Sequence, residues 1–174
     1  MSHILLSFTL LFTCLYTSPS QADITKDVQG SFQRIEHALN DRNDPLKKVN
    51  VLHDSIVEDA IFKVTVKNPV LTPAQNATEL QLNKEEYINS FLIGARYVKD
   101  YNVNIDLKSV NHNADKHIVS NVAFEETGSV LDPRNLGNNG KPFISKTICT
   151  FNHASDLKIS SSSCKTDVSF EQQI

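Results

Sequence analysis

The sequence predicts an α+β domain in which the helices come first and a largely antiparallel sheet follows. Apolar residues recur at helical spacing in residues 23–42. From about residue 59 the apolar period changes to two, which is typical of half-buried strands, and alternating runs continue to residue 170. No linker composition and no internal repeat divides the chain, so we expect a single domain over residues 23–174.

Residues 1–22 differ in composition from the rest of the chain. They contain no Lys, Arg, Asp or Glu, and their apolar run, which ends near Tyr16, is shorter than the roughly 20 residues that a spanning helix needs. Ser20 and Ala22 place small residues where signal peptidase reads them. We therefore expect a signal peptide that is cleaved after Ala22, and a secreted or periplasmic mature chain without a membrane span.

The number of cysteines in the mature chain, and the roles open to them, depend on that cleavage. An uncleaved anchor and a lipoprotein lipidated at Cys14 are the alternatives. After cleavage, Cys149 and Cys164 remain, an even number in an oxidising compartment. A hairpin turn near Asp156 would set the two almost directly opposite each other on neighbouring strands, within disulfide range. No Cys-x-x-Cys redox motif occurs, so we predict a structural disulfide.

Charge argues against two classes of partner. The chain has 17 basic and 20 acidic residues and a formal net charge of −3, with no block of Lys or Arg. Nucleic acid and anionic membranes attract basic patches, so we expect neither as a partner.

Two helices are predicted at the start of the mature chain. The helix at 23–42 has one apolar stripe, made of Ile24, Val28, Phe32, Ile35 and Leu39. A second, short helix follows Asp44, a favourable N-cap, and Pro45, which suits a first helical position. Its apolar side consists of Leu46, Val49 and Leu52.

A strand, a loop and a third helix follow. Residues 59–70 alternate, with Phe62, Val64 and Val66 on one face, and residues 72–81 are predicted to form a loop. Asn83 and Glu86 form a capping-box pattern that begins the third helix. The apolar side of this helix is Tyr87, Ile88, Phe91, Leu92 and Ala95.

The rest of the chain is predicted to be antiparallel sheet. Alternation from Tyr101 to Leu107 leads through the polar turn 111–116 to a second run, Ile118, Ser120, Val122 and Phe124. A loop at 127–142 precedes a last hairpin, whose strands are 143–151 and 158–170.

Two stretches, "HDSIVEDAIFKV" (53–64) and "NHASDLKISSSSC" (152–164), together with this order of elements, resemble the nuclear transport factor 2-like, or SnoaL-like, superfamily. The resemblance implies a cone-shaped roll, in which a curved sheet wraps around a long helix and encloses an apolar pocket. Members include isomerases, dehydratases, cyclases, subunits without catalysis and protein-binding modules, and many form homodimers through the outer sheet face.

The resemblance also implies where an isomerase would carry its base, on the inner side of the first strand. That face has only Phe62, Val64 and Val66, and the penultimate strand, where a partner acid would lie, reads Ser-Lys-Thr at 145–147. A proton-abstracting enzyme needs both groups. We therefore expect a domain without this chemistry.

Three polar residues are candidates for the pocket. Tyr87, on the third helix, has a hydroxyl that could orient a ligand, although a core aromatic explains it as well. Asn121 alternates with apolar residues and either points inward or lies on the outer face. His117 borders a turn whose polarity needs no further explanation.

No metal or cofactor is expected. His112, Asp115 and His117 cluster in sequence but straddle the predicted turn, and His153 is predicted in the next exposed turn. Asn76, in an Asn-Ala-Thr sequon, is a possible glycosylation site if the host glycosylates exported proteins.

We therefore expect an exported domain that binds a small apolar ligand or a partner protein without catalysis. The first alternative is a SnoaL-like enzyme of the dehydratase, cyclase or isomerase type, which would use Tyr87, Asn121 and His117. The second is an accessory subunit of an envelope assembly.

Overall fold

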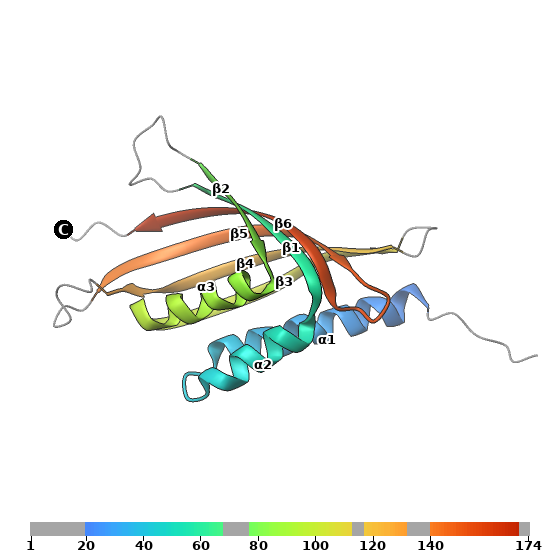
Figure 1. Ribbon diagram of the computed structural model, residues 1–174, viewed down its shortest axis with the longest axis horizontal. Helices are drawn as coiled ribbons and strands as arrows, with labels where there is room; N and C mark the ends of the chain where they lie inside the picture. Colours follow the sequence, from blue (N-terminus) through green and yellow to red (C-terminus); the bar gives the residue numbers. More distant parts are fainter. Residues whose placement is uncertain (1–19, 68–76, 113–116, 132–139, 171–174) are drawn as a thin grey trace, which may run out of the picture.

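The computed structural model describes residues 20–67, 77–112, 117–131 and 140–170. Along the chain the elements are α1 (Gln21–Asn40), α2 (Pro45–Ser55), β1 (Ile56–Lys67), β2 (Thr78–Asn83), α3 (Lys84–Tyr97), β3 (Val98–His112), β4 (Ile118–Val130), β5 (Lys141–His153) and β6 (Ile159–Phe170) (Figure 1). Several predicted features lie outside the described residues: the segment 1–19 with Cys14, Asn76, Asp115, the side chain of Ala95 and residues 132–139 of the predicted loop 127–142.

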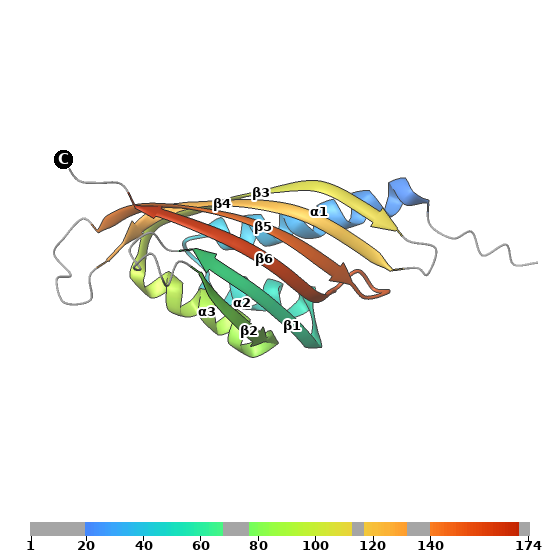
Figure 2. The same ribbon diagram turned by 90° about the horizontal axis from the view of Figure 1, so that it is seen from above.

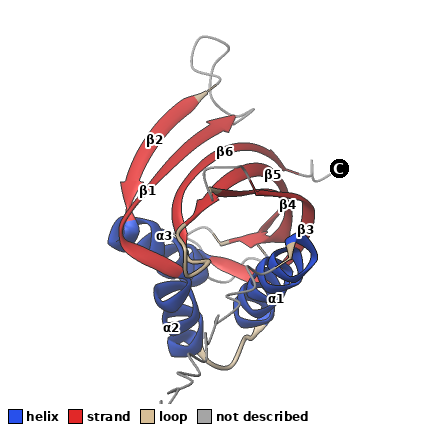
Figure 3. Cartoon of the chain, turned by 90° about the vertical axis from the view of Figure 1, so that its right-hand side faces the viewer, coloured by secondary structure: helices blue, strands red, loops and turns tan. Residues whose placement is uncertain are grey.

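The six strands form one sheet in the order β2-β1-β6-β5-β4-β3. The β1–β6 pair is parallel and the other pairs are antiparallel. The sheet curves over the helices, with α2 and α3 below β1 and α1 along β3 (Figures 2 and 3). Helices therefore cover the concave face, and the predicted α+β class is confirmed.

The first helix is displaced by two residues from its predicted position at 23–42. It begins at Gln21 because Ser20 and Asp23 form a capping box. It ends at Asn40, whose side-chain amide donates to the carbonyl of Val103 and accepts from its N–H, both at 2.8 Å. The side chain of Asn40 thus pairs with the edge strand β3, as a further strand would.

The second helix begins as predicted, with Asp44 accepting from the backbone N–H of Lys47 and Pro45 in its first turn. One prediction for this helix is wrong: Leu46 is 74% exposed, whereas Leu52 is buried. Six residues at 3.6 per turn place Leu46 about 120° around the helix from Leu52, so the two cannot face the same core.

The prediction of a loop at residues 72–81 is wrong for residues 78–81, which belong to a strand. Residues from Thr78 form β2, which pairs antiparallel with β1 from Val66 to Ile61. An edge strand can be held by its backbone ladder alone, and Leu80 on β2 is 45% exposed. The strand does alternate, with Leu80 and Leu82 separated by Gln81, but only Leu82 is partly buried, so the apolar signal is short and weak.

The remaining boundaries follow the predictions with extensions. Asn83 and Glu86 form the predicted capping box of α3. β1 begins earlier than residue 59, at Ile56, with an irregular register before Ile61. β4 ends at Val130 and β5 begins at Lys141, so these strands include both ends of the segment 127–142 that was predicted as a loop.

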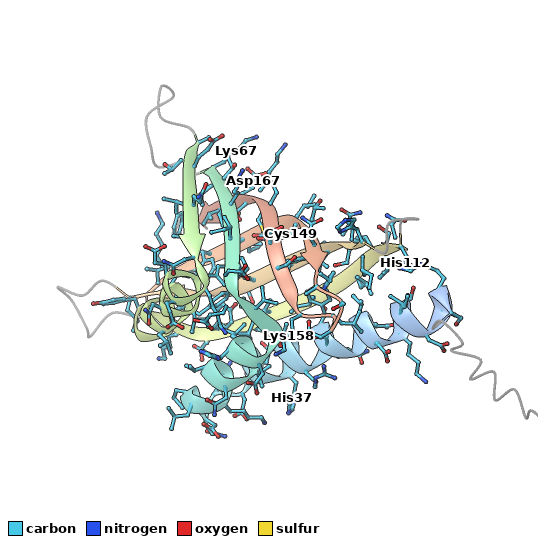
Figure 4. All side chains as sticks on the ribbon, turned by 45° about the vertical axis from the view of Figure 1, so that its right-hand side comes forward. His37, Lys67, His112, Cys149, Lys158 and Asp167 are labelled. Carbon is cyan, nitrogen blue, oxygen red and sulfur yellow. A yellow bond between two sulfur atoms is a disulfide. The ribbon has the colours of Figure 1, made fainter. Side chains whose placement is uncertain are left out.

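The last hairpin has the predicted register, in which Cys149 lies directly opposite Cys164. The two form a disulfide with a Cα–Cα distance of 4.1 Å, and both are buried. Figure 4 shows Cys149 on the central part of the sheet and His112 at its far end. The predicted structural disulfide is confirmed.

Among the described helices, none combines the length and the apolar composition that a bilayer crossing requires.

Candidate functional site

An apolar cavity of about 140 Å³ lies between the helices and the concave face of the sheet. Its aromatic lining consists of Phe32, Tyr87, Phe91, Phe124 and Phe151. The Cys149–Cys164 disulfide also borders it. An engineered apolar cavity of roughly 150 Å³ admits a benzene molecule, so this inner cavity is the size of one aromatic ring.

A second, outer cavity of about 600 Å³ lies between α2, α3 and the ends of β3, β5 and β6. Four residues line both cavities: Leu39, Leu52, Phe91 and Glu126. Because they share this wall, the two cavities adjoin. The outer one falls in the usual volume range of small-molecule sites.

Glu126 is the carboxylate at the junction. The alternation of β4 places it on the same face as Val122 and Phe124, and Ser145 lies opposite on β5. Its Oε1 accepts a hydrogen bond from the Tyr101 hydroxyl at 2.7 Å, and its Oε2 accepts one from the Ser145 hydroxyl at 3.0 Å. A partly buried carboxylate is thus held in a fixed orientation by two donors.

Two tyrosines stay neutral beside this carboxylate. Burial raises the pKa of Tyr87, and the charge of Glu126 raises it further. Burial also raises the pKa of Tyr101, as do the charge of Glu126 and their hydrogen bond. Tyr87 stacks on Phe62 with ring centroids 3.9 Å apart, so its ring is fixed against β1. Both phenols therefore retain their O–H at physiological pH.

The three residues proposed for the pocket are not brought together. Tyr87 lines the inner cavity. Asn121 lies on the outer sheet face, where its side chain bonds Ser109 and Thr150 at 2.9 Å each. His117 is exposed just before β4. Because Ser120 and Val122 are buried, strand alternation places Asn121 on the opposite face, so the three side chains do not converge on one pocket.

The sequence predictions missed Glu126. A usable signal was present, because the inward series Ile118, Ser120, Val122 and Phe124 continues to Glu126 two residues later. A carboxylate at a position that the pattern assigns to the core indicates a hydrogen-bonded or functional group.

His153 was predicted in an exposed turn, and this prediction is wrong. The residue is 7% exposed and packs edge-on against Phe32. Its Nδ1 lies 3.0 Å from the carbonyl of Leu157 and its Nε2 lies 2.8 Å from the hydroxyl of Ser120. A carbonyl only accepts, so Nδ1 donates and Nε2 accepts from Ser120. Neither Ser120 nor His153 lines the two cavities, and the pair is structural.

Protonation of His153 should destabilise the fold. Burial lowers its pKa from 6.5, more than the bond to Leu157 raises it. Below pH 6.5 the unfolded chain binds a proton that the folded chain excludes, so the free energy of unfolding should fall by up to about 1.4 kcal/mol per pH unit. Urea denaturation between pH 7 and pH 5 measures this slope.

The matched variants are His153→Asn and His112→Asn, the latter at an exposed position at the end of β3. The first should flatten the slope between pH 7 and pH 5, and the second should leave it unchanged. An unchanged slope in His153→Asn would show that other groups cause the pH dependence.

Within the residues that the structure describes, no group of three His, Cys, Asp or Glu side chains is arranged to hold a metal. His112 and His117 are exposed at the ends of β3 and before β4. Asp115, the third member of the sequence cluster, lies outside the described residues.

Neither a scan against protein-family models nor a search of curated proteins returns a match. Solved structures do match. A protein from Novosphingobium aromaticivorans assigned as an aromatic ring hydroxylase has a TM-score of 0.57 at 10% identity, covering 88% of this chain and 96% of that chain. One assigned as the beta subunit of an aromatic-ring-hydroxylating dioxygenase, from the same species, has a TM-score of 0.55 at 10% identity, covering 89% and 95%.

A further similar structure is BvnE pinacolase from Penicillium brevicompactum, with a TM-score of 0.50 at 10% identity, covering 82% of this chain and 87% of that chain. Identities this low show the fold alone. They confirm the predicted cone-shaped fold of helices packed in a curved sheet.

Proposed function

We propose that this chain, which has the nuclear transport factor 2-like fold, binds a small and mainly apolar ligand in its two adjoining cavities without catalysis. The observation that carries the proposal is an aromatic-lined interior with one oriented carboxylate, Glu126, at the junction of the cavities. Ligand sites of this kind are apolar, with a few polar groups that fix orientation.

The polar groups restrict the ligand. A carboxylate oxygen can accept two hydrogen bonds, and each oxygen of Glu126 already accepts one, from Tyr101 or Ser145. A ligand hydroxyl or N–H group could use the remaining capacity. We therefore propose a ligand with an aromatic or alicyclic ring in the inner cavity and one hydrogen-bond donor near Glu126.

A second candidate function is catalysis with Glu126 as a general base. The observation in its favour is the position of this carboxylate, which lies on the cavity wall within hydrogen-bond reach of a tyrosine. The argument against it is that Tyr101 and Ser145 each donate to one of its oxygens, so a substrate proton would compete with a bound donor at either oxygen. A ligand recovered unchanged by mass spectrometry after incubation with the protein supports binding, and conversion supports catalysis.

Filling the inner cavity should abolish much of the binding. Val64 lines it from β1, and Val64→Phe adds a ring there. The dissociation constant of N-phenyl-1-naphthylamine, an uncharged aromatic amine that fluoresces in apolar sites, should rise at least about tenfold, or about 1.4 kcal/mol. Fluorescence titration measures this constant.

Thr65→Phe is the matched control, because Thr65 is the next residue of β1 and points to the opposite face of the sheet. It should leave the dissociation constant unchanged. Thermal unfolding of both variants checks that they fold. Equal effects of the two substitutions, or no probe binding to the unaltered protein, would contradict the proposed site.

We also propose that the chain is exported, with residues 1–22 removed. The uncharged N-terminal segment and the buried disulfide both support this, since structural disulfides are typical of oxidising compartments. N-terminal sequencing of the exported protein should begin at Asp23. A start at Met1 would contradict the proposal.

A homodimer through the outer sheet face has less support. Ile148 is 68% exposed on that face, but its cross-strand neighbours are Ala123 and Lys165, and the face around it carries hydrogen-bonded Asn, Ser and Thr side chains. Ile61 is also exposed on this face, but β1 lies two strands away from β5, so the two isoleucines do not form the apolar patch that a stable interface needs. We therefore propose that the monomer is the binding unit, and sedimentation velocity tests this.

A further inference from the structure

We propose that the ligand is an organic anion, whose acidic group binds Lys48 at the wall of the outer cavity while its ring enters the inner cavity. The inference rests on the proposed function and adds the chemical class of the ligand. It follows from how the charged side chains around the outer cavity are paired.

Lys48 differs from the other charged residues at this end of the cone. Arg42 pairs with Asp100 at 3.2 Å, and Lys47 pairs with Asp41 at 3.1 Å. Lys48 lines the outer cavity, yet among the described residues no carboxylate lies within 4 Å of its ammonium group. The outer cavity thus has one cation that is available to a ligand.

The surroundings of Lys48 favour an anion. The side chain is half-buried, and burial lowers its pKa, as does the charge of Arg42, while Asp41 opposes both effects. A lysine that has lost water and faces a second cation gains more from a bound anion than an exposed lysine does.

Glu126 sets the orientation of such a ligand. Its negative charge stands where the two cavities meet, so it repels an acidic group that would move toward the inner cavity. The inner cavity offers aromatic surface and is the size of a ring. Repulsion at the junction and attraction at Lys48 together place the ring inward and the acid outward.

Two fluorescent probes test the inference directly. N-phenyl-1-naphthylamine is uncharged, and 1-anilinonaphthalene-8-sulfonate has the same ring frame with one negative charge. We expect the unaltered protein to bind the sulfonate more tightly. Lys48→Met should weaken sulfonate binding about fivefold, with no change for the uncharged probe, and raised salt should reduce the difference.

Lys47→Met is the control, because it removes an equal charge from the neighbouring position of α2 but leaves the outer cavity lining intact. It should leave the affinity for the uncharged probe unchanged and weaken sulfonate binding less than Lys48→Met does, since Asp41 loses its partner but Lys48 remains. Two results would overturn the inference, provided that the uncharged probe still binds the cavity. One is that Lys48→Met binds the sulfonate as tightly as the unaltered protein does. The other is that Lys47→Met loses as much sulfonate affinity as Lys48→Met. Sulfonate binding that survives Val64→Phe would also overturn it, since the probe would then lie elsewhere. Failure of the uncharged probe to bind would instead reject the proposed function.

Discussion

Reduction of the Cys149–Cys164 disulfide is expected to lower the free energy of unfolding by about 3 kcal/mol. The bond joins residues 15 apart in sequence, and cross-linking a loop of this size reduces the entropy of the unfolded chain by about that amount. Both cysteines are buried beneath the helices, so reduction should require partial opening of the hairpin. Urea denaturation of oxidised and reduced protein measures the difference.

The control is the double variant Cys149→Ala/Cys164→Ala, whose stability should not respond to a reductant. Intact-mass analysis of the natively exported protein should give a mass lower by two hydrogen atoms than that of the reduced form. Two free thiols in that protein would contradict both the disulfide and the argument for export that uses it.

Truncation of Phe151 to alanine is expected to destabilise the fold by about 3–5 kcal/mol. Phe151 is 1% exposed and lies at the centre of an aromatic cluster, with ring centroids 5.3 Å from Phe32 and 6.1 Å from Phe124. Its truncation removes a ring contact between α1 and the sheet and enlarges the inner cavity, which this ring lines. Urea denaturation checks the loss of stability.

Ile148→Ala on the same strand is the matched control. Ile148 points to the outer face and is 68% exposed, so its truncation should change the free energy of unfolding by less than about 0.5 kcal/mol. If the two substitutions cost the same, the aromatic cluster does not hold the helices against the sheet. The loss of stability in Phe151→Leu should lie between the losses in Phe151→Ala and Ile148→Ala, since leucine keeps most of the buried volume.

Features encoded by neighbouring residues were predictable from the sequence. The capping box of Asn83 and Glu86 and the cap at Asp44 depend on a few adjacent residues, and each begins a helix as predicted. The register of Cys149 with Cys164 follows from the position of one turn. These patterns are local, so tertiary contacts had little opportunity to override them.

Features that depend on distant contacts were not predictable. His153 is buried because Phe32 of α1 packs on its ring and Ser120 of β4 bonds it, and neither neighbour is near it in sequence. β2 pairs with β1, which is distant in sequence, and only Leu82 of its side chains packs against the core. For the site, Tyr87 lines the inner cavity, Asn121 lies on the outer face, which is one of the two positions that the pattern left open, and Glu126 was overlooked.

The pairing of Asn40 with β3 bears on how this protein avoids aggregation. β3 is a 15-residue edge strand, and an uncovered edge of that length recruits strands from other molecules. Asn40 satisfies both backbone groups of Val103, so α1 covers the edge at that residue. The opposite edge of the described sheet is β2, which has only six residues and offers a short template. The first helix therefore occupies the position at which another molecule's strand would pair with this edge.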